Sequence, residues 1–134
     1  MEANILRQLY KQYAGSEPTE VAELPGAGSN RRYFRLKGAQ TLIGVLGECV
    51  EENRHFAAKG LPVPKVLCKS DDDMAYLQED LGDTLLFEAI EKGRKTRVFS
   101  DEEKSMLSAT IKQLCEFQFL GADGMDFSNC YPSP

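Results

Sequence analysis

Between residues 19 and 79 the chain is divided into short apolar runs by turns rich in glycine, proline and aspartate, and this division constrains the fold more than any other feature. In chain order the runs are EVAEL, RRYFRL, TLIGVL, KVLC and MAYLQE. The turns between them include GAGSN, KGAQ and KSDDD. Runs of this length favour β-strands, and a polar turn such as KSDDD favours a hairpin. We therefore expect an antiparallel sheet of about five strands.

Helical spacing of apolar residues appears before these runs and once among them. Residues 5–13 carry apolar side chains on one helical face, and Gly15 follows as a stop signal. Residues 49–59 carry a shorter helical pattern that closes at Gly60, before prolines that cannot continue a helix. We expect one helix at each place.

After the last apolar run the pattern is helical throughout. Asp83 is placed to cap a helix that ends at Gly93. Ser100 and Glu103 match a capping box, which starts a second helix that ends at Gly121. A sheet followed by helices predicts an α+β fold.

The composition is that of a globular protein, since apolar residues make up 42% and charged residues 28% of the 134 positions. The net charge is -5 without a basic cluster, so neither nucleic acid nor an anionic membrane is an expected partner. No apolar run approaches the roughly 20 residues of a membrane span and no leader is recognisable, so the cytoplasm is the expected location. Four scattered cysteines and one histidine form no zinc motif, and we expect reduced, mostly buried thiols.

The segment GAGSN, residues 26–30, is the first candidate for chemistry, because predicted strands flank it and three arginines follow it closely. Glycine lets a backbone approach phosphate oxygens, serine and asparagine add neutral donors, and arginine offers a fork of donors suited to phosphate. The combination suits a nucleoside triphosphate. The same residues also suit an ordinary hairpin turn, and they form neither a Walker loop nor a dinucleotide fingerprint.

Alternation along the second run divides its arginines between two faces of the sheet. Arg32 falls on an otherwise apolar face with Phe34 and Leu36, and Arg31 falls on the other face. A buried guanidinium without a partner is prohibitively costly. Arg32 should therefore meet a carboxylate, face a ligand at the strand's mouth, or lie at a solvated strand end.

The segment YLQEDLGD, residues 76–83, is the second candidate. A strand runs directly into an acidic, glycine-containing turn and then into a helix, as happens where a sheet lobe is followed by a helical lobe. Backbone groups at such a strand end can pair with an adenine edge. This arrangement is also generic, so it indicates a nucleotide site only together with the glycine segment.

In order along the chain, GAGSNRRYFRL, LPVPKVL and YLQEDLGDTLL resemble the N-terminal lobe of the aminoglycoside phosphotransferase and choline kinase superfamily, which has a protein-kinase-like fold. The chain is most similar to the bacterial subgroup related to the amino-sugar kinases that act on N-acetylmuramate or N-acetylglucosamine. The resemblance covers roughly residues 22–131. It implies an ATP-binding lobe over residues 1–80, and a hinge with the first helices of a helical lobe over residues 81–134.

The resemblance also implies which residues contact ATP. The turn over the phosphates corresponds to Gly26, Ala27, Gly28, Ser29 and Asn30. The hinge that stacks and hydrogen-bonds adenine corresponds to Gln78, Glu79, Asp80 and Leu81. Glu51 or Glu52 corresponds to the carboxylate that normally pairs a phosphate-binding lysine, and the choice between them stays open.

The sequence departs from the family pattern in three places. The third run has no lysine, so we expect an arginine of the second run to supply the charge, Arg32 first and Arg31 next. The helix of residues 49–59 is shorter than in the family, either truly or because residues near His55 are missing. No HGD-like catalytic loop and no acidic magnesium motif is present, so we assign no residue as catalytic or as a metal ligand.

The implied activity is transfer of the γ-phosphoryl group of ATP, with Mg2+, to a hydroxyl of a sugar, amino sugar or similar small metabolite. We expect the chain to be the ATP-binding portion of such an enzyme, truncated before its catalytic loop and magnesium ligands, and inactive alone. The alternative is a non-catalytic nucleotide-binding or regulatory module with the same lobe. Apolar faces within residues 100–120 should pack against further helices or pair in a dimer.

Overall fold

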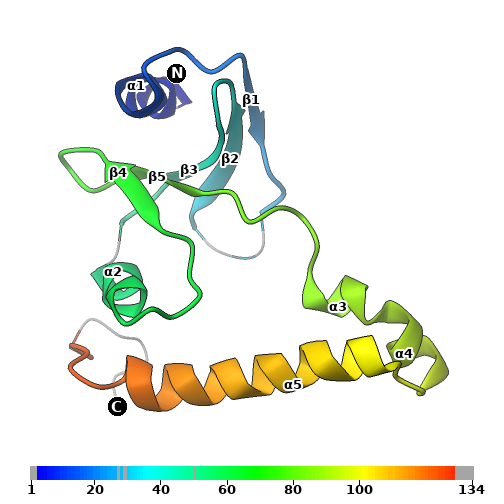
Figure 1. Ribbon diagram of the computed structural model, residues 1–134. Coiled ribbons are helices and arrows are strands. Elements are labelled where there is room, and N and C mark those ends of the chain that lie inside the picture. The colour runs from blue at the N-terminus through cyan, green and yellow to red at the C-terminus, as the bar shows by residue number, and fades with distance from the viewer. Residues whose placement is uncertain (1–2, 27, 29, 50, 129–134) are drawn as a thin grey trace. The chain divides into compact units, whose positions relative to one another are not determined.

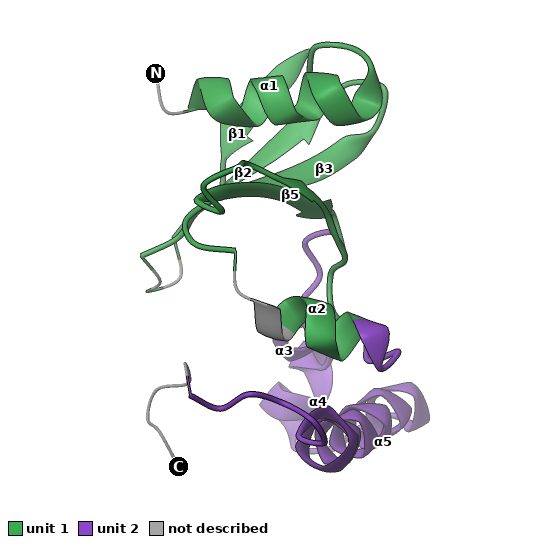
Figure 2. Cartoon of the chain, turned by 90° about the vertical axis from the view of Figure 1, so that its left-hand side faces the viewer, with its two compact units in different colours: residues 1–57, 62–81 green, residues 58–61, 82–134 purple. Residues whose placement is uncertain are grey.

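The computed structural model describes residues 3–26, 28, 30–49 and 51–128, and for Glu51 and Glu52 it describes the backbone alone. The chain has an α+β fold made of two compact units (Figure 2). Unit 1 comprises residues 1–57 and 62–81, and unit 2 comprises residues 58–61 and 82–134.

Unit 1 is built on a five-stranded antiparallel sheet, which confirms the expected strand number (Figure 1). Its strands are β1 (Glu20–Glu23), β2 (Arg32–Lys37), β3 (Thr41–Leu46), β4 (Val66–Lys69) and β5 (Ala75–Glu79). They lie in the order β1-β2-β3-β5-β4. The predicted hairpin is confirmed, since β4 and β5 pair across the KSDDD turn.

Helix α1 (Ala3–Ala14) covers one face of this sheet, as its apolar spacing predicts. Leu6, Leu9 and Tyr10 of the helix are buried against Phe34, Leu36, Leu42 and Leu77 of the strands. The helix ends before Gly15, which has φ +79° and donates its amide to the carbonyl of Lys11. A left-handed residue at this position is a common helix stop, so the stop signal is confirmed.

The hydroxyl of Tyr10 joins α1 to the turn between β2 and β3. It donates to the carbonyl of Gln40 at 2.6 Å and accepts from the amide of Gln40 at 3.0 Å. The Tyr10 side chain is fully buried, so both hydrogen bonds replace water that its hydroxyl has lost.

The other face of the sheet carries a smaller apolar cluster of Ile43, Val45 and Tyr76. Tyr33 and Cys49 pack against this cluster and are partly buried. The short helix α2 (Glu51–Ala58) follows Cys49 after one residue, at the predicted place. The Asn53 side-chain amide donates to the carbonyl of Pro64 at 2.9 Å, which ties α2 to the segment that leads into β4.

Unit 2 contains α3 (Leu86–Ala89), α4 (Glu91–Thr96), α5 (Asp101–Glu116) and one π-helical turn, η1 (Phe117–Gly121). The capping box is confirmed, because Ser100 Oγ accepts from the Glu103 amide and Glu103 Oε2 accepts from the Ser100 amide. The prediction that Asp83 caps the next helix is wrong. Helix α3 begins three residues later, and the Glu88 carboxylate accepts the Leu85 amide that would otherwise need a cap.

The predicted helix end at Gly93 is also wrong, because Gly93 lies inside α4 and is buried there. Gly93 matters for packing within unit 2, because a side chain has no room there. A Cβ atom at this position would overlap Phe99 Cδ1 and would lie 2.7 Å from Glu103 Oε2. The Gly93 amide donates to Glu103 Oε1 at 2.8 Å, so the absent side chain lets the chain before α5 and the first turn of α5 approach α4.

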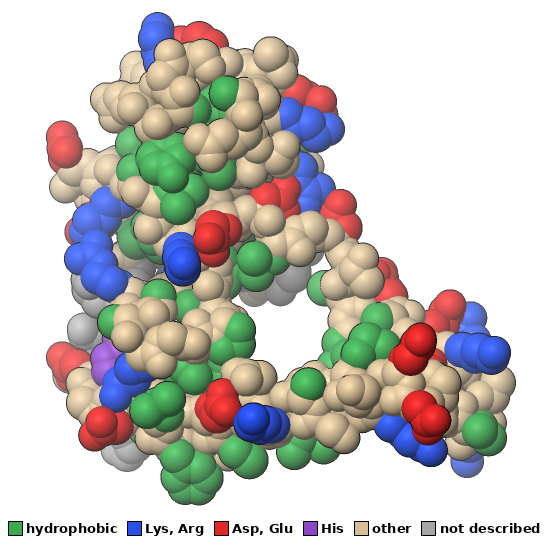
Figure 3. Space-filling model, in the orientation of Figure 1, with side chains coloured by type: hydrophobic (Ala, Val, Ile, Leu, Met, Phe, Trp, Pro, Cys, Tyr) green, Lys and Arg blue, Asp and Glu red, His purple; other side chains and the backbone are tan. Residues whose placement is uncertain are grey.

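Large apolar side chains remain on the surface of α5 and η1 (Figure 3). They include Ile111 and Leu114 at 64% and 57% exposure, and Phe119 at 79%. Cys115 on the same helix is exposed, which corrects the expectation of mostly buried thiols for this residue. Within the described ranges no helix is both long enough and apolar enough to span a membrane.

We expect unit 2 to lose stability in acid through Glu103. Hydrogen bonds from the Ser100 and Gly93 amides lower the pKa of this carboxyl. Because the folded pKa lies below the unfolded one, the stabilisation is complete above the ordinary glutamate pKa of about 4.3 and is lost as the pH falls through the folded value. Thermal unfolding followed through α5 amide signals should show this loss in the wild type and a weaker pH dependence in Glu103→Gln.

Glu102→Gln is the matched control, since Glu102 is exposed in the same first turn of α5. This variant should keep the wild-type pH dependence. An equal change in both variants would show that net charge, and not the Glu103 hydrogen bonds, governs the acid response.

Candidate functional site

The described residues of the glycine segment lie in the connection between β1 and β2. Gly26, Gly28 and Asn30 are exposed, while Ala27 and Ser29 lie outside the described residues. Gly28 has φ +77°, a conformation that side chains rarely adopt. Apart from the glycine itself and its two chain neighbours, no described atom lies within 4 Å of a Cβ built at Gly26 or Gly28, so the described chain leaves the space beside both residues open.

Arg32 meets a carboxylate, which is one of the alternatives open from the sequence. Its Nε and Nη2 donate to the two carboxylate oxygens of Glu23 on β1, at 2.8 and 3.0 Å. Its guanidinium also lies 5.3 Å from the ring centre of Phe34, on the face covered by α1. The hydrogen bond from Arg32 lowers the pKa of Glu23, which keeps the pair charged.

Arg31 lies on the opposite face of the sheet from Arg32. A Cβ atom at Gly47, just after β3, would come 2.7 Å from Arg31 Cγ, so the arginine stem passes over this glycine. Its charge also acts on Tyr76 of β5: burial raises the pKa of the Tyr76 hydroxyl, and Arg31 opposes that rise. Arg31 therefore belongs to the face that carries Tyr33 and Tyr76.

A second bidentate ion pair, on the face of Arg31 and opposite the Arg32–Glu23 pair, joins Arg35 to Asp80. Arg35 Nε donates to Asp80 Oδ2 at 2.6 Å, and Nη2 donates to Oδ1 at 3.0 Å. The side chains are only 16% and 12% exposed. The pair reaches from β2 past β3 to the residue after β5, and sequence reasoning missed it. Arginine on a strand and aspartate after another strand were visible signals, but the strand order was needed to match them.

The predicted hinge residues occupy the end of β5 and the two positions beyond it. Gln78 and Glu79 are half-buried at the end of the strand. The Glu79 amide donates to the Lys65 carbonyl at 3.1 Å, and Glu79 Oε2 accepts from the Lys65 amide at 3.0 Å. Leu81 is 70% exposed. The side chains of Glu51 and Glu52 lie outside the described part of the chain, so their pairing stays a prediction.

The glycine segment and the hinge lie at opposite ends of one sheet face. Gly47, which Arg31 crosses, donates its amide to the carbonyl of Met74 at 2.8 Å, so these residues mark one end. Glu79 marks the other end, opposite Leu42 at the start of β3. From Met74 to Glu79 the chain advances five residues, which is roughly 17 Å of strand. An extended nucleoside triphosphate has about this length.

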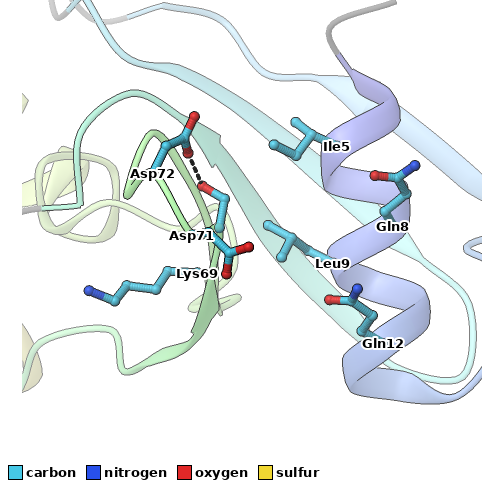
Figure 4. Close-up of a pocket in the computed structure, with 8 residues that line it drawn as sticks. Ile5, Gln8, Leu9, Gln12, Lys69, Asp71 and Asp72 are labelled. Carbon is cyan, nitrogen blue, oxygen red and sulfur yellow. Dashed lines mark hydrogen bonds between the residues drawn. The ribbon is translucent and has the colours of Figure 1, made fainter.

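A pocket of about 350 Å³ opens elsewhere, between α1 and the β4–β5 turn (Figure 4). Ile5 and Leu9 point from α1 toward the turn, which contributes Asp71 and Asp72. None of the predicted site residues lines this pocket. Within the described residues, no group of three or more His, Cys, Asp or Glu side chains could hold a metal ion.

We expect the Arg35–Asp80 pair to stabilise unit 1 more than an exposed ion pair does. Double-mutant cycles with alanine should give a coupling energy of about 2 kcal/mol for this largely buried pair. The control is the Lys37–Glu20 pair between β2 and β1, whose side chains are 48% and 54% exposed. It should give no more than about 0.5 kcal/mol in urea unfolding. Equal coupling energies would contradict the structural importance of Arg35–Asp80.

Comparison with known proteins adds no assignment. No protein-family model matches the chain, and no curated protein matches it. The kinase resemblance of its glycine segment and hinge therefore rests on the residues themselves.

Proposed function

We propose that this chain carries the ATP-binding part of a phosphotransferase, which moves the γ-phosphoryl group of ATP to a hydroxyl of a sugar, amino sugar or similar small metabolite. One observation carries the proposal. A single sheet face has an arginine and an open glycine turn at one end and a strand exit at the other, separated by roughly the length of the nucleotide.

The phosphates would lie at the glycine end. The backbone around Gly26 and Gly28 is open, and a positive φ at Gly28 is typical of turns whose amides converge on an anion. Arg31 would add a planar fork of donors, which suits phosphate oxygens. Catalysis of phosphoryl transfer consists largely of such positioning and charge stabilisation.

Arg31 is a better candidate for this charge than Arg32. Arg32 is committed to Glu23 through two hydrogen bonds and lies on the face that α1 covers. Arg31 lies on the face that leads to the hinge, next to Gly47. The preference for Arg32 drawn from the sequence is thereby reversed in the proposal.

The adenine would lie at the hinge end. The strand exit around Glu79 and Leu81 offers backbone donors and acceptors of the kind that pair with a base edge. Half-buried Gln78 and Arg35 lie beside it on the same face. The hydroxyl acceptor and the proton-accepting group are assigned to none of the described residues, so the acceptor class rests on the resemblance alone.

We expect Arg31→Ala to weaken ATP binding about tenfold, because one charge-assisted contact to phosphate is lost. Isothermal titration of the chain with Mg-ATP measures this directly. Lys37→Ala is the matched control, since it removes a cation from the far end of β2. It should leave the affinity within about twofold of the wild type.

The competing outcomes are distinct. If Arg32→Ala weakens binding and Arg31→Ala does not, the assignment from the sequence is right. If the wild-type chain binds no ATP, the proposed function fails. If ATP binds but the intact coding sequence yields no transfer to any sugar or amino sugar, the chain is a nucleotide-binding module and not an enzyme.

A further inference from the structure

We propose that the Arg35–Asp80 ion pair positions the hinge backbone for base recognition, and that it makes the site select adenine over guanine nucleotides. The inference rests on the proposed ATP site. It assigns a role in that site to the Arg35–Asp80 pair, which lies at the adenine end and not at the phosphates. Its starting point is the way in which the strand ladder ends around Leu81.

On the β3 side the ladder cannot continue to Leu81. Leu42 lies opposite Glu79, so the next positions bring Thr41 opposite Asp80 and Gln40 opposite Leu81. The Tyr10 hydroxyl already occupies both the amide and the carbonyl of Gln40. Gln40 is therefore engaged by Tyr10 and not by the strand partner that would continue the ladder.

On the β4 side the ladder ends in the same way. Lys65 bonds to Glu79 through its carbonyl and its amide. The preceding residue, Pro64, has no amide hydrogen, and its carbonyl accepts from Asn53. Beyond Glu79 the backbone thus leaves both ladders. The Leu81 side chain is 70% exposed, and no described residue takes up the Leu81 backbone amide or carbonyl.

A strand end that leaves both neighbours would have an undefined direction without a further restraint. Asp80 supplies it, because both of its carboxylate oxygens are held by one guanidinium at 2.6 and 3.0 Å. Two parallel hydrogen bonds fix orientation as well as distance. The peptide that follows Asp80 is then fixed relative to β2, on the face of the proposed nucleotide.

A fixed backbone edge distinguishes bases by its pattern of donors and acceptors. Adenine presents an amino donor beside a ring acceptor, and guanine presents a carbonyl acceptor beside a ring donor. A pre-oriented peptide pairs well with only one of these patterns, whereas a loose one adapts to both. The ion pair therefore acts on selectivity through the backbone of Leu81, and Arg35 and Asp80 are positioning residues.

The test measures the affinity of the chain for ATP and for GTP in the wild type and in Asp80→Asn. The variant keeps the shape of the side chain and removes its charge. We expect ATP affinity to fall about tenfold while GTP affinity changes less than about twofold. Glu20→Gln is the matched control, since it makes the same change in the exposed pair with Lys37 and should leave both affinities unchanged.

Each other result is decisive. Equal losses for ATP and GTP in Asp80→Asn would show a merely structural role and overturn the inference, as would an unchanged preference. Equal binding of ATP and GTP by the wild type would overturn it while leaving nucleotide binding intact. Binding of neither nucleotide by the wild type would overturn the proposed function itself.

A measurement without ligand covers the case in which Asp80→Asn folds poorly. Arg35→Lys keeps the positive charge and loses the fork, so the NMR order parameter of the Leu81 amide should fall from about 0.85 toward about 0.6 while that of Leu77 in the buried strand stays constant. An unchanged order parameter at Leu81 would show that the pair does not hold the hinge, and would overturn the inference independently of any nucleotide.

Discussion

The hydroxyl of Tyr10 is the contact on which the layered arrangement of unit 1 depends. Its ring is buried in the core between α1 and the sheet, and its oxygen is satisfied by the two backbone groups of Gln40. A buried phenol hydroxyl without such partners would lose its hydrogen bonds to water and gain none in return. Because Gln40 supplies these partners, α1 is held at the β2–β3 turn. Leu6 and Leu9 of the helix then pack on the same face of the sheet. That face is closed, and the opposite one carries the candidate site.

Elements with strong local signals were predictable from the sequence. The strands follow from short apolar runs between turn residues, α1 from its spacing and Gly15, and the start of α5 from Ser100 and Glu103. Each of these signals lies within a few residues of the element that it specifies. The same locality explains the failure at Asp83, where the chain continues without a helix and Glu88 satisfies the first amide of α3.

The sequence predicted which segments belong to the candidate site, but not which side chains of these segments pair with one another. Arg31 and Arg32 are neighbours in sequence with similar chemistry, and only their faces and partners tell them apart. Arg35 and Asp80 are separated by 45 positions, and their pairing depends on the strand order. The sequence predicts a helix end at Gly93 because glycine is common there, but the role of this residue depends on Phe99 and Glu103. Tertiary contacts decided each of these cases.

The two ion pairs between β1 and β2 have a consequence for how the protein behaves in a crowded solution. β1 is an edge strand of only four residues, and Glu20 and Glu23 hold Lys37 and Arg32 across its ladder. Charges on a short edge strand discourage the addition of a strand from another molecule. The glycine turn leaves the sheet directly after this strand. The segment that we propose to bind phosphates is thus attached to an edge whose charges oppose strand addition, and the exposed glutamates contribute more to solubility than to the free energy of folding.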